Sequence, residues 1–143
     1  MIFLDTSVLA RLMLRDQPEE YEAARQLLRQ PRRYGVTGTV LLELVWLLKS
    51  KRIGHTDIAR AMAAILALPN LHCPDIEAVW TAQMAHTAGM DFADALHLAI
   101  SAEAGATSFV TADPLMARHA ERLGLQPPVE LVRLLPPEAP TDA

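Results

Sequence analysis

Two acidic residues directly follow short apolar runs, a placement typical of ligand sites in α/β proteins. Asp5 comes after Ile2 to Leu4, and Asp113 comes shortly after a strand predicted over 108–110. In open α/β sheets the ligand crevice lies outside the carboxyl ends of the strands. Asp5 and Asp113 are therefore predicted to lie at one edge of a sheet.

Two further acids are predicted near that edge. Glu43 lies one turn into a helix that follows the second strand, and Asp94 lies in the first turn of the helix before the fourth strand. Gathered carboxylates raise each other's pKa unless a counter-charge is present. Oxygen ligands suit Mg²⁺ or Mn²⁺, and the His and Cys residues show no zinc-like spacing. The four acids therefore predict a site for one or two Mg²⁺ or Mn²⁺ ions.

Each acid also has a local explanation. Asp91 and Asp113 precede predicted helices, as N-caps do, and Asp113 is followed by Pro114. Asp94 can simply favour the helix dipole. Glu43 has almost only apolar neighbours, so a solvated side chain explains it less well. Capping and metal binding can coexist in one residue.

The elements that must position these acids alternate along the chain. Strands are predicted over 2–4, 34–37, 71–73, 108–110 and 129–132, and helices over 8–13, 19–29, 40–49 with Thr39 as cap, 56–68, 75–88, 91–105 and 114–124. Parallel strands need such crossovers, so the pattern predicts an α/β fold around a parallel sheet. Residues 1–135 are predicted to form one domain, followed by a frayed Pro-rich tail over 136–143.

Composition and charge narrow the function classes. The chain has 143 residues, 51% of them hydrophobic, with no apolar run long enough to span a membrane and no export leader. The lone Cys73 fits a reducing compartment, so a cytoplasmic protein is expected. The net charge of -4 argues against a general nucleic-acid coat. Two bound divalent cations would cancel that charge, so a nuclease remains possible.

Four motifs in order carry a resemblance to a known family. They are FLDTSVL at 3–9, EL at 43–44, DFADALHLA at 91–99 and FVTAD at 109–113. The chain resembles the PIN-domain ribonucleases, particularly the VapC-type toxins of toxin–antitoxin pairs. The resemblance implies a three-layer α/β/α sandwich with a five-stranded parallel sheet of order 3-2-1-4-5. It also implies RNA as substrate and Mg²⁺ or Mn²⁺ held by Asp5, Glu43, Asp94 and Asp113.

The same resemblance implies supporting residues and partners. Thr6 or Ser7 and Thr111 match hydroxyl positions that orient carboxylates or water, although local turn and cap bonding explains them equally well. An antitoxin encoded next to this gene and a homodimer are expected. The amphipathic helices at 19–29 and 56–68 can bind such a partner, or can simply pack on the core.

An RNA substrate must also be held by its phosphates. Arg11 and Arg15 follow the first acid, while Lys49, Lys51 and Arg52 close the helix that carries Glu43, so these five are candidates. Cations at a helix C-terminus also stabilise the helix dipole.

Three other residues are predicted to have structural rather than catalytic or RNA-binding roles. His97, one turn beyond Asp94, is interpreted as a surface or packing residue rather than a general base. Trp46 and Trp80 are interpreted as core or interface residues rather than base-stacking platforms.

Alternative functions remain open. A DNA-directed metal nuclease has the same sequence features. A catalytically silent module could use an acidic crevice to capture a basic partner peptide. A haloacid-dehalogenase-like enzyme would need an Asp-x-Asp motif, which residues 5–7 lack, and a receiver domain would need paired acids and a placed lysine.

Overall fold

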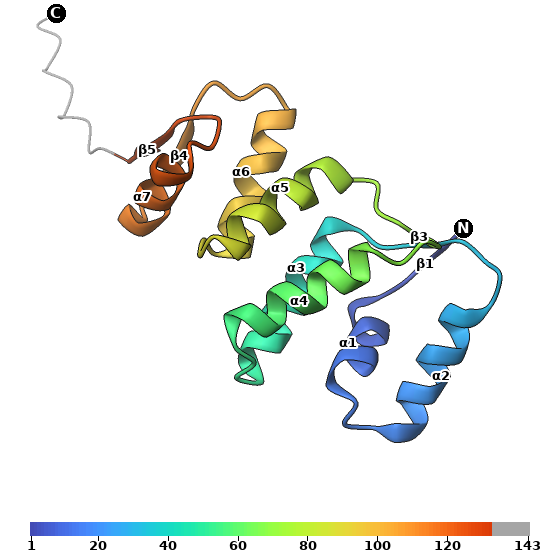
Figure 1. Cartoon of the computed structure of the whole chain (residues 1–143). Coiled ribbons are helices and arrows are strands. Elements are labelled where there is room, and N and C mark those ends of the chain that lie inside the picture. Colours follow the sequence, from blue (N-terminus) through green and yellow to red (C-terminus); the bar gives the residue numbers. More distant parts are fainter. Residues whose placement is uncertain (133–143) are drawn as a thin grey trace, which may run out of the picture.

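The computed structural model describes residues 1–132 and has an α/β fold with twelve elements (Figure 1). The strands are β1 (Ile2–Phe3), β2 (Tyr34–Gly35), β3 (Leu71–His72), β4 (Phe109–Thr111) and β5 (Val129–Leu131). The helices are α1 (Thr6–Leu14), α2 (Pro18–Arg29), α3 (Gly38–Ser50), α4 (His55–Leu66), α5 (Ile76–Thr87), α6 (Phe92–Glu103) and α7 (Pro114–Leu123). The predicted tail over 136–143 lies outside the described residues.

All predicted elements are present within a few residues of their expected bounds. One cap differs, because α3 begins at Gly38 and Thr37, not Thr39, accepts a hydrogen bond from the Val40 N–H. Pro opens α2 and α7, where a missing N–H costs nothing. Gly124 ends α7 in the left-handed conformation, which suits glycine.

All strand pairs are parallel, which confirms the predicted class of sheet. The strands form a three-stranded sheet of order β1-β2-β3 and a separate two-stranded sheet of β4 and β5. Within residues 1–132 no pairing joins β1 to β4. The expected order 3-2-1-4-5 is therefore present in two parts, and its central junction is not confirmed.

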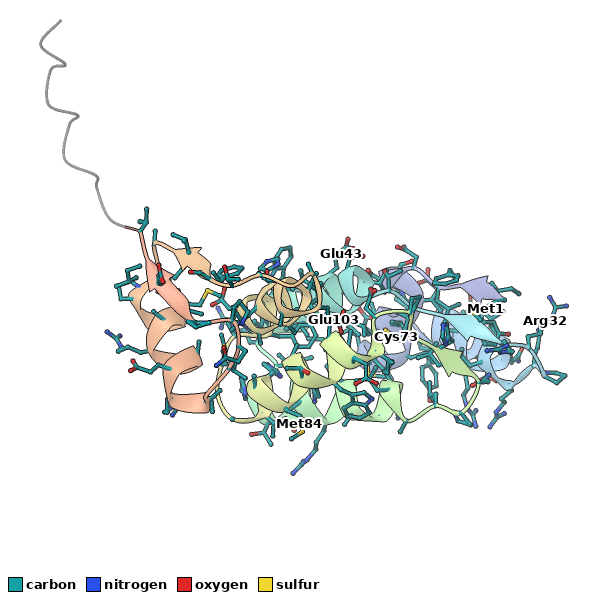
Figure 2. All side chains as sticks on the ribbon, turned by 90° about the horizontal axis from the view of Figure 1, so that it is seen from above. Met1, Arg32, Glu43, Cys73, Met84 and Glu103 are labelled. Carbon is teal, nitrogen blue, oxygen red and sulfur yellow. The ribbon has the colours of Figure 1, made fainter. Side chains whose placement is uncertain are left out.

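The two sheets lie at opposite ends of the molecule, with α5 and α6 between them (Figure 1). The C-terminal part, β4, α7 and β5, follows α6 in the chain. It contacts the end of α5, where Arg122 donates to the Ala88 carbonyl at 3.3 Å. Figure 2 shows the elongated shape that results, with Glu43 near the middle of its length. The carboxyl ends of β1 and β4, which were expected at one edge of a single sheet, thus belong to separate sheets.

β1 and β4 each have one side that pairs with no other strand within residues 1–132. The N–H groups of Ile2 and Leu4 donate to β2, so the Phe3 N–H between them points to the free side of β1. On β4, Phe109 and Thr111 bond toward β5, so Val110 faces the other way. Phe3 is 53% exposed and Val110 is 59% exposed. Apolar, unpaired edges of this kind are templates for pairing with a further strand.

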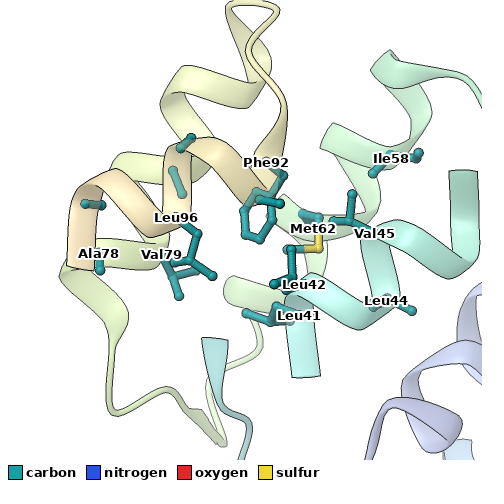
Figure 3. Close-up of a cluster of buried hydrophobic side chains, with 14 of the residues drawn as sticks. Leu41, Leu42, Leu44, Val45, Ile58, Met62, Ala78, Val79, Phe92 and Leu96 are labelled. Atoms are coloured by element: carbon teal, nitrogen blue, oxygen red, sulfur yellow. The ribbon is translucent and has the colours of Figure 1, made fainter. Parts of the chain in front are cut away.

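The core lies among α3, α4, α5 and α6 (Figure 3). The near-continuous apolar sequence of α3 is buried on several sides, with Leu41, Leu44 and Leu48 almost inaccessible to solvent. Phe92 at the start of α6 and Met62 of α4 are fully buried in the same cluster. Each such side chain contributes roughly 1.5 to 3 kcal/mol through burial. α3 and α6 are therefore firmly placed, and they carry Glu43 and Asp94.

Candidate functional site

The turn after β1 holds Asp5 at the N-terminus of α1. Asp5 is the N-cap of α1, and its Oδ2 accepts hydrogen bonds from the Ser7 hydroxyl at 2.8 Å and from the Ser7 N–H at 3.5 Å. These bonds, the Ser7 hydroxyl first, lower the pKa of the Asp5 carboxyl below its ordinary value. Asp5 is thus an exposed carboxylate held in a fixed direction by its own turn.

Glu43 is connected to the same turn by Thr6. The buried Thr6 donates from Oγ1 to Glu43 Oε2 at 2.9 Å, and the two residues are 37 positions apart in the chain. The helix α3 brings Glu43 to this place, since its other faces are packed in the core. The hydroxyls of Thr6 and Ser7 therefore orient the carboxylates of Glu43 and Asp5, respectively.

Asp91 and Asp94 share the first turn of α6. Asp91 caps this helix by accepting the Asp94 N–H at 3.1 Å, as predicted. Its other oxygen, Oδ1, accepts a hydrogen bond from Lys49 Nζ at 2.6 Å. Burial by itself would raise the pKa of Asp91, yet the Lys49 ammonium and the Asp94 N–H bring it below its ordinary value.

Asp94 has the opposite electrostatic environment. Partial burial, then the charges of Asp91 and Asp113, raise the pKa of its carboxyl above the ordinary value. A carboxylate in this setting gains from a nearby cation.

Asp113 follows β4 and caps α7. Its Oδ1 accepts the Leu115 N–H at 2.9 Å, which confirms the predicted N-cap. Thr111 Oγ1 accepts the Asp113 N–H at 3.1 Å. The Thr111 hydroxyl thus makes the local turn bond that was one of its two expected roles.

The four acids lie in two groups. Asp5 and Glu43 are both held by the turn after β1, whereas Asp113 is one of the charges that raise the pKa of Asp94. Among residues 1–132, no three His, Cys, Asp or Glu side chains lie close enough together to hold a metal ion. The donor chemistry suits Mg²⁺ or Mn²⁺, but the placement of the donors in this structure does not.

Three of the five predicted phosphate-binding cations have other contacts. Arg11 forms ion pairs with Asp16 at 3.3 Å and Glu20 at 2.7 Å. Arg15 lies over the Tyr21 ring, 5.1 Å from its centroid, and Lys49 pairs with Asp91. Within the described part of the chain, Lys51 and Arg52 form no salt bridge, so they are the more available candidates.

Both tryptophans are partly exposed, so neither is a buried core residue, and an interface role stays a prediction. Trp46 is 55% exposed and Trp80 is 41% exposed. Trp46 follows Glu43 by one turn on the exposed side of α3, the side that is not needed for the core. His97 is exposed on α6, and its charge lowers the pKa of Asp94 in opposition to the larger effects of burial, Asp91 and Asp113.

The Lys49–Asp91 ion pair was missed by the sequence reasoning. The two residues are 42 positions apart, and neither lies in a motif that indicates the other. The sequence predicts a helix cap at Asp91 and, at Lys49, either a phosphate contact or a cation that stabilises the helix dipole. Only the packing of α3 against α6 brings them together.

Comparisons with known proteins identify the family. The chain matches the PIN domain over residues 2–122, and it belongs to that family. It is similar to the solved structure of Mycobacterium tuberculosis VapC20, described as a toxin that cleaves the sarcin–ricin loop. That similarity is 22% in identity, with 87% of this chain and 96% of that chain covered and a TM-score of 0.41. No curated protein matches the chain.

No helix within residues 1–132 is both long enough and apolar enough to cross a bilayer.

Proposed function

We propose that this PIN-domain protein is a divalent-metal-dependent ribonuclease and the toxin of a toxin–antitoxin pair. The observation that supports this most strongly is the family match over residues 2–122 in a chain with all four acids of the motifs. Asp5 and Asp113 come shortly after β1 and β4 and cap α1 and α7, while Glu43 lies near the middle of α3 and Asp94 in the first turn of α6. We assign metal binding to these four carboxylates and assign the cleavage of RNA phosphodiester bonds to the site they form.

This function requires the two groups of acids to come together. We propose that β4 pairs with the open edge of β1, which would place the carboxyl ends of both strands at one edge of a single sheet. Phe3 and Val110 are the exposed edge residues that would be covered. Pairing would satisfy their backbone groups, which now face solvent, and would bring Asp113 toward Asp5.

The chain's own residues would prepare the site for the metal. Ser7 and Thr6 hold Asp5 and Glu43 in fixed directions, which lowers the entropic cost of binding a cation. Burial and the charges of Asp91 and Asp113 raise the pKa of Asp94, and a bound cation would oppose them by favouring the ionised carboxylate. Lys51 and Arg52 are proposed to hold phosphates of the RNA.

The partners follow from the proposed class. An antitoxin from the adjacent gene and a second copy of the chain are the proposed protein partners, in the cytoplasm. An apolar depression of about 460 Å³ between α1 and α2 begins at Ser7 and includes Arg11, Glu20 and Leu27. A partner segment seated there would lie beside Asp5, which supports binding of the antitoxin at this place.

The experiment is a cleavage assay with purified protein, Mg²⁺ or Mn²⁺, and end-labelled RNA and DNA. Wild type should cut RNA only when metal is present, and Asp5→Asn should lose at least about a hundredfold in kcat/KM. Cutting of DNA alone would indicate the DNA-directed alternative. Intact RNA and DNA, with tight binding of an Arg-containing peptide, would indicate a silent binding module and contradict the proposed function.

A further inference from the structure

The ammonium group of Lys49 links the two helices that carry candidate site acids. Lys49 Nζ lies 2.6 Å from Asp91 Oδ1, a short charge-assisted hydrogen bond between the end of α3 and the start of α6. The second oxygen of Asp91 accepts the Asp94 N–H at 3.1 Å. A continuous chain of bonds therefore runs from Lys49 through Asp91 to the backbone of Asp94.

Two side chains on the exposed side of α3 bond to other helices. Near the middle of α3, Glu43 accepts a hydrogen bond from Thr6 of α1 at 2.9 Å. Near its end, Lys49 reaches Asp91 of α6. Because the other sides of α3 are packed in the core, these two bonds fix the relative positions of Glu43 and the first turn of α6.

The pair has little to contribute to overall stability. The side chains of Lys49 and Asp91 are 41% and 38% exposed, and ion pairs with such exposure contribute little to the free energy of unfolding. The capping bond to Asp94 needs only a side-chain oxygen, so an uncharged Asn could supply it. The main effect of the ion pair is therefore positional. It holds the Asp91 side chain, and with it the first turn of α6, in place.

We propose that Lys49 is a positioning residue for Asp94 that acts through Asp91, rather than a ligand of RNA phosphate. This inference rests on the proposed function, because it assigns a task to Asp94. The ammonium of Lys49 is already neutralised by the carboxylate of Asp91, whereas Lys51, two residues later, has no such partner among residues 1–132. The two lysines at the end of α3 thus have different tasks, although the sequence presents them as one basic cluster.

A double-mutant cycle tests the inference. Lys49→Met removes the charge and keeps the length of the side chain, and Asp91→Asn removes the charge and keeps the cap. Each single variant should lower kcat for RNA cleavage about ten- to a hundredfold with KM nearly unchanged, because a misplaced group acts on the chemical step. The double variant should be no worse than either single variant, and Lys49→Arg should restore most of kcat.

Lys51→Met is the matched contrast, since it removes the same charge from the same end of α3. It should raise KM and weaken the salt dependence of RNA binding. If Lys49→Met gives this same signature, or if the losses of Lys49→Met and Asp91→Asn multiply, Lys49 acts on the RNA directly and the inference is overturned.

A second readout does not need catalysis. Hydrogen exchange of the Asp94 amide, measured by NMR at constant pH, should be faster in both single variants and no faster in the double variant. Independent effects on this exchange would overturn the inference even if wild type cut no RNA. Absence of cleavage by wild type with a coupled effect on exchange would instead contradict the proposed function and leave the Lys49–Asp91–Asp94 linkage intact.

Discussion

Thr6 Oγ1 lies 2.9 Å from Glu43 Oε2, and this bond connects the turn after β1 to the helix α3. Thr6 is 8% exposed, so its hydroxyl has few alternatives to this acceptor and to the Val40 carbonyl at 3.4 Å. The side chain of Glu43, in contrast, is exposed to solvent. The direction of the Glu43 carboxylate therefore depends on Thr6.

Replacing Thr6 by Val should disturb the site more than the fold. Val has the same shape without the hydroxyl, so the loss is one hydrogen bond to a charged group, about 1.5 to 3 kcal/mol at most. Because a freely rotating Glu43 is less often in place, kcat for RNA cleavage should fall about tenfold or more. Steady-state cleavage and urea denaturation measure the two effects.

Thr6→Ser is the control, since it keeps the hydroxyl. It should retain most of the activity of wild type. Equal activity of Thr6→Val and Thr6→Ser would mean that Glu43 does not need this bond.

His86 makes the stability of the fold sensitive to acid. It is fully buried on α5, neither ring nitrogen has a hydrogen-bond partner within the described residues, and the tilted ring of His55 lies against it with 4.1 Å between the ring centroids. Burial first, and then the charges of His55 and Lys49, lower the pKa of His86 from 6.5 to about 4. The folded protein thus keeps His86 neutral over a pH range in which the unfolded chain takes up a proton.

The free energy of unfolding should therefore fall as the pH falls from about 6.5 to about 4, and His86 should cause no further loss below that range. The loss is on the order of 3 kcal/mol. His86→Leu should remove this part of the pH dependence. Urea denaturation at several pH values checks it, and identical pH profiles for the two proteins would show that His86 is not the cause.

The open edges of β1 and β4 give a prediction about backbone protection. If the two strands pair when metal binds, the amides of Phe3 and Val110 should both exchange slowly with solvent in Mg²⁺ and rapidly in EDTA, because pairing gives each N–H an acceptor. The Leu4 amide, which already donates to Gly35 at 2.8 Å, is the internal control. Rapid exchange of Phe3 and Val110 under both conditions would contradict the proposed pairing.

The helices could be predicted because each has its own periodicity and end signals. Pro18, Pro114 and Gly124 mark helix boundaries that the structure confirms, and the capping roles of Asp91 and Asp113 follow from their places before a helix. These features depend on residues close together in the chain. Local rules therefore suffice for them.

The long-range relationships could not be predicted in the same way. Lys49 and Asp91 look like a dipole cation and a cap when each is read alone, and only packing across 42 positions makes them a pair. Trp46 lies in an almost wholly apolar helix, yet it occupies the side that the core leaves exposed. The strands β1 and β4 are unpaired with each other in the described structure, and both are so short that their sequences contain too few residues to specify a neighbour.

The proposed ribonuclease must bind one metal centre with Asp5, Glu43, Asp94 and Asp113 together, and paramagnetic broadening by Mn²⁺ tests this most directly. In ¹⁵N-labelled protein, small amounts of Mn²⁺ should broaden the amide signals of Thr6, beside Asp5, and of Leu115, beside Asp113, at the same metal concentration. Asp5→Asn should weaken both effects together. Broadening at Leu115 that is unchanged in Asp5→Asn would show that the acids do not share an ion, and would contradict the account.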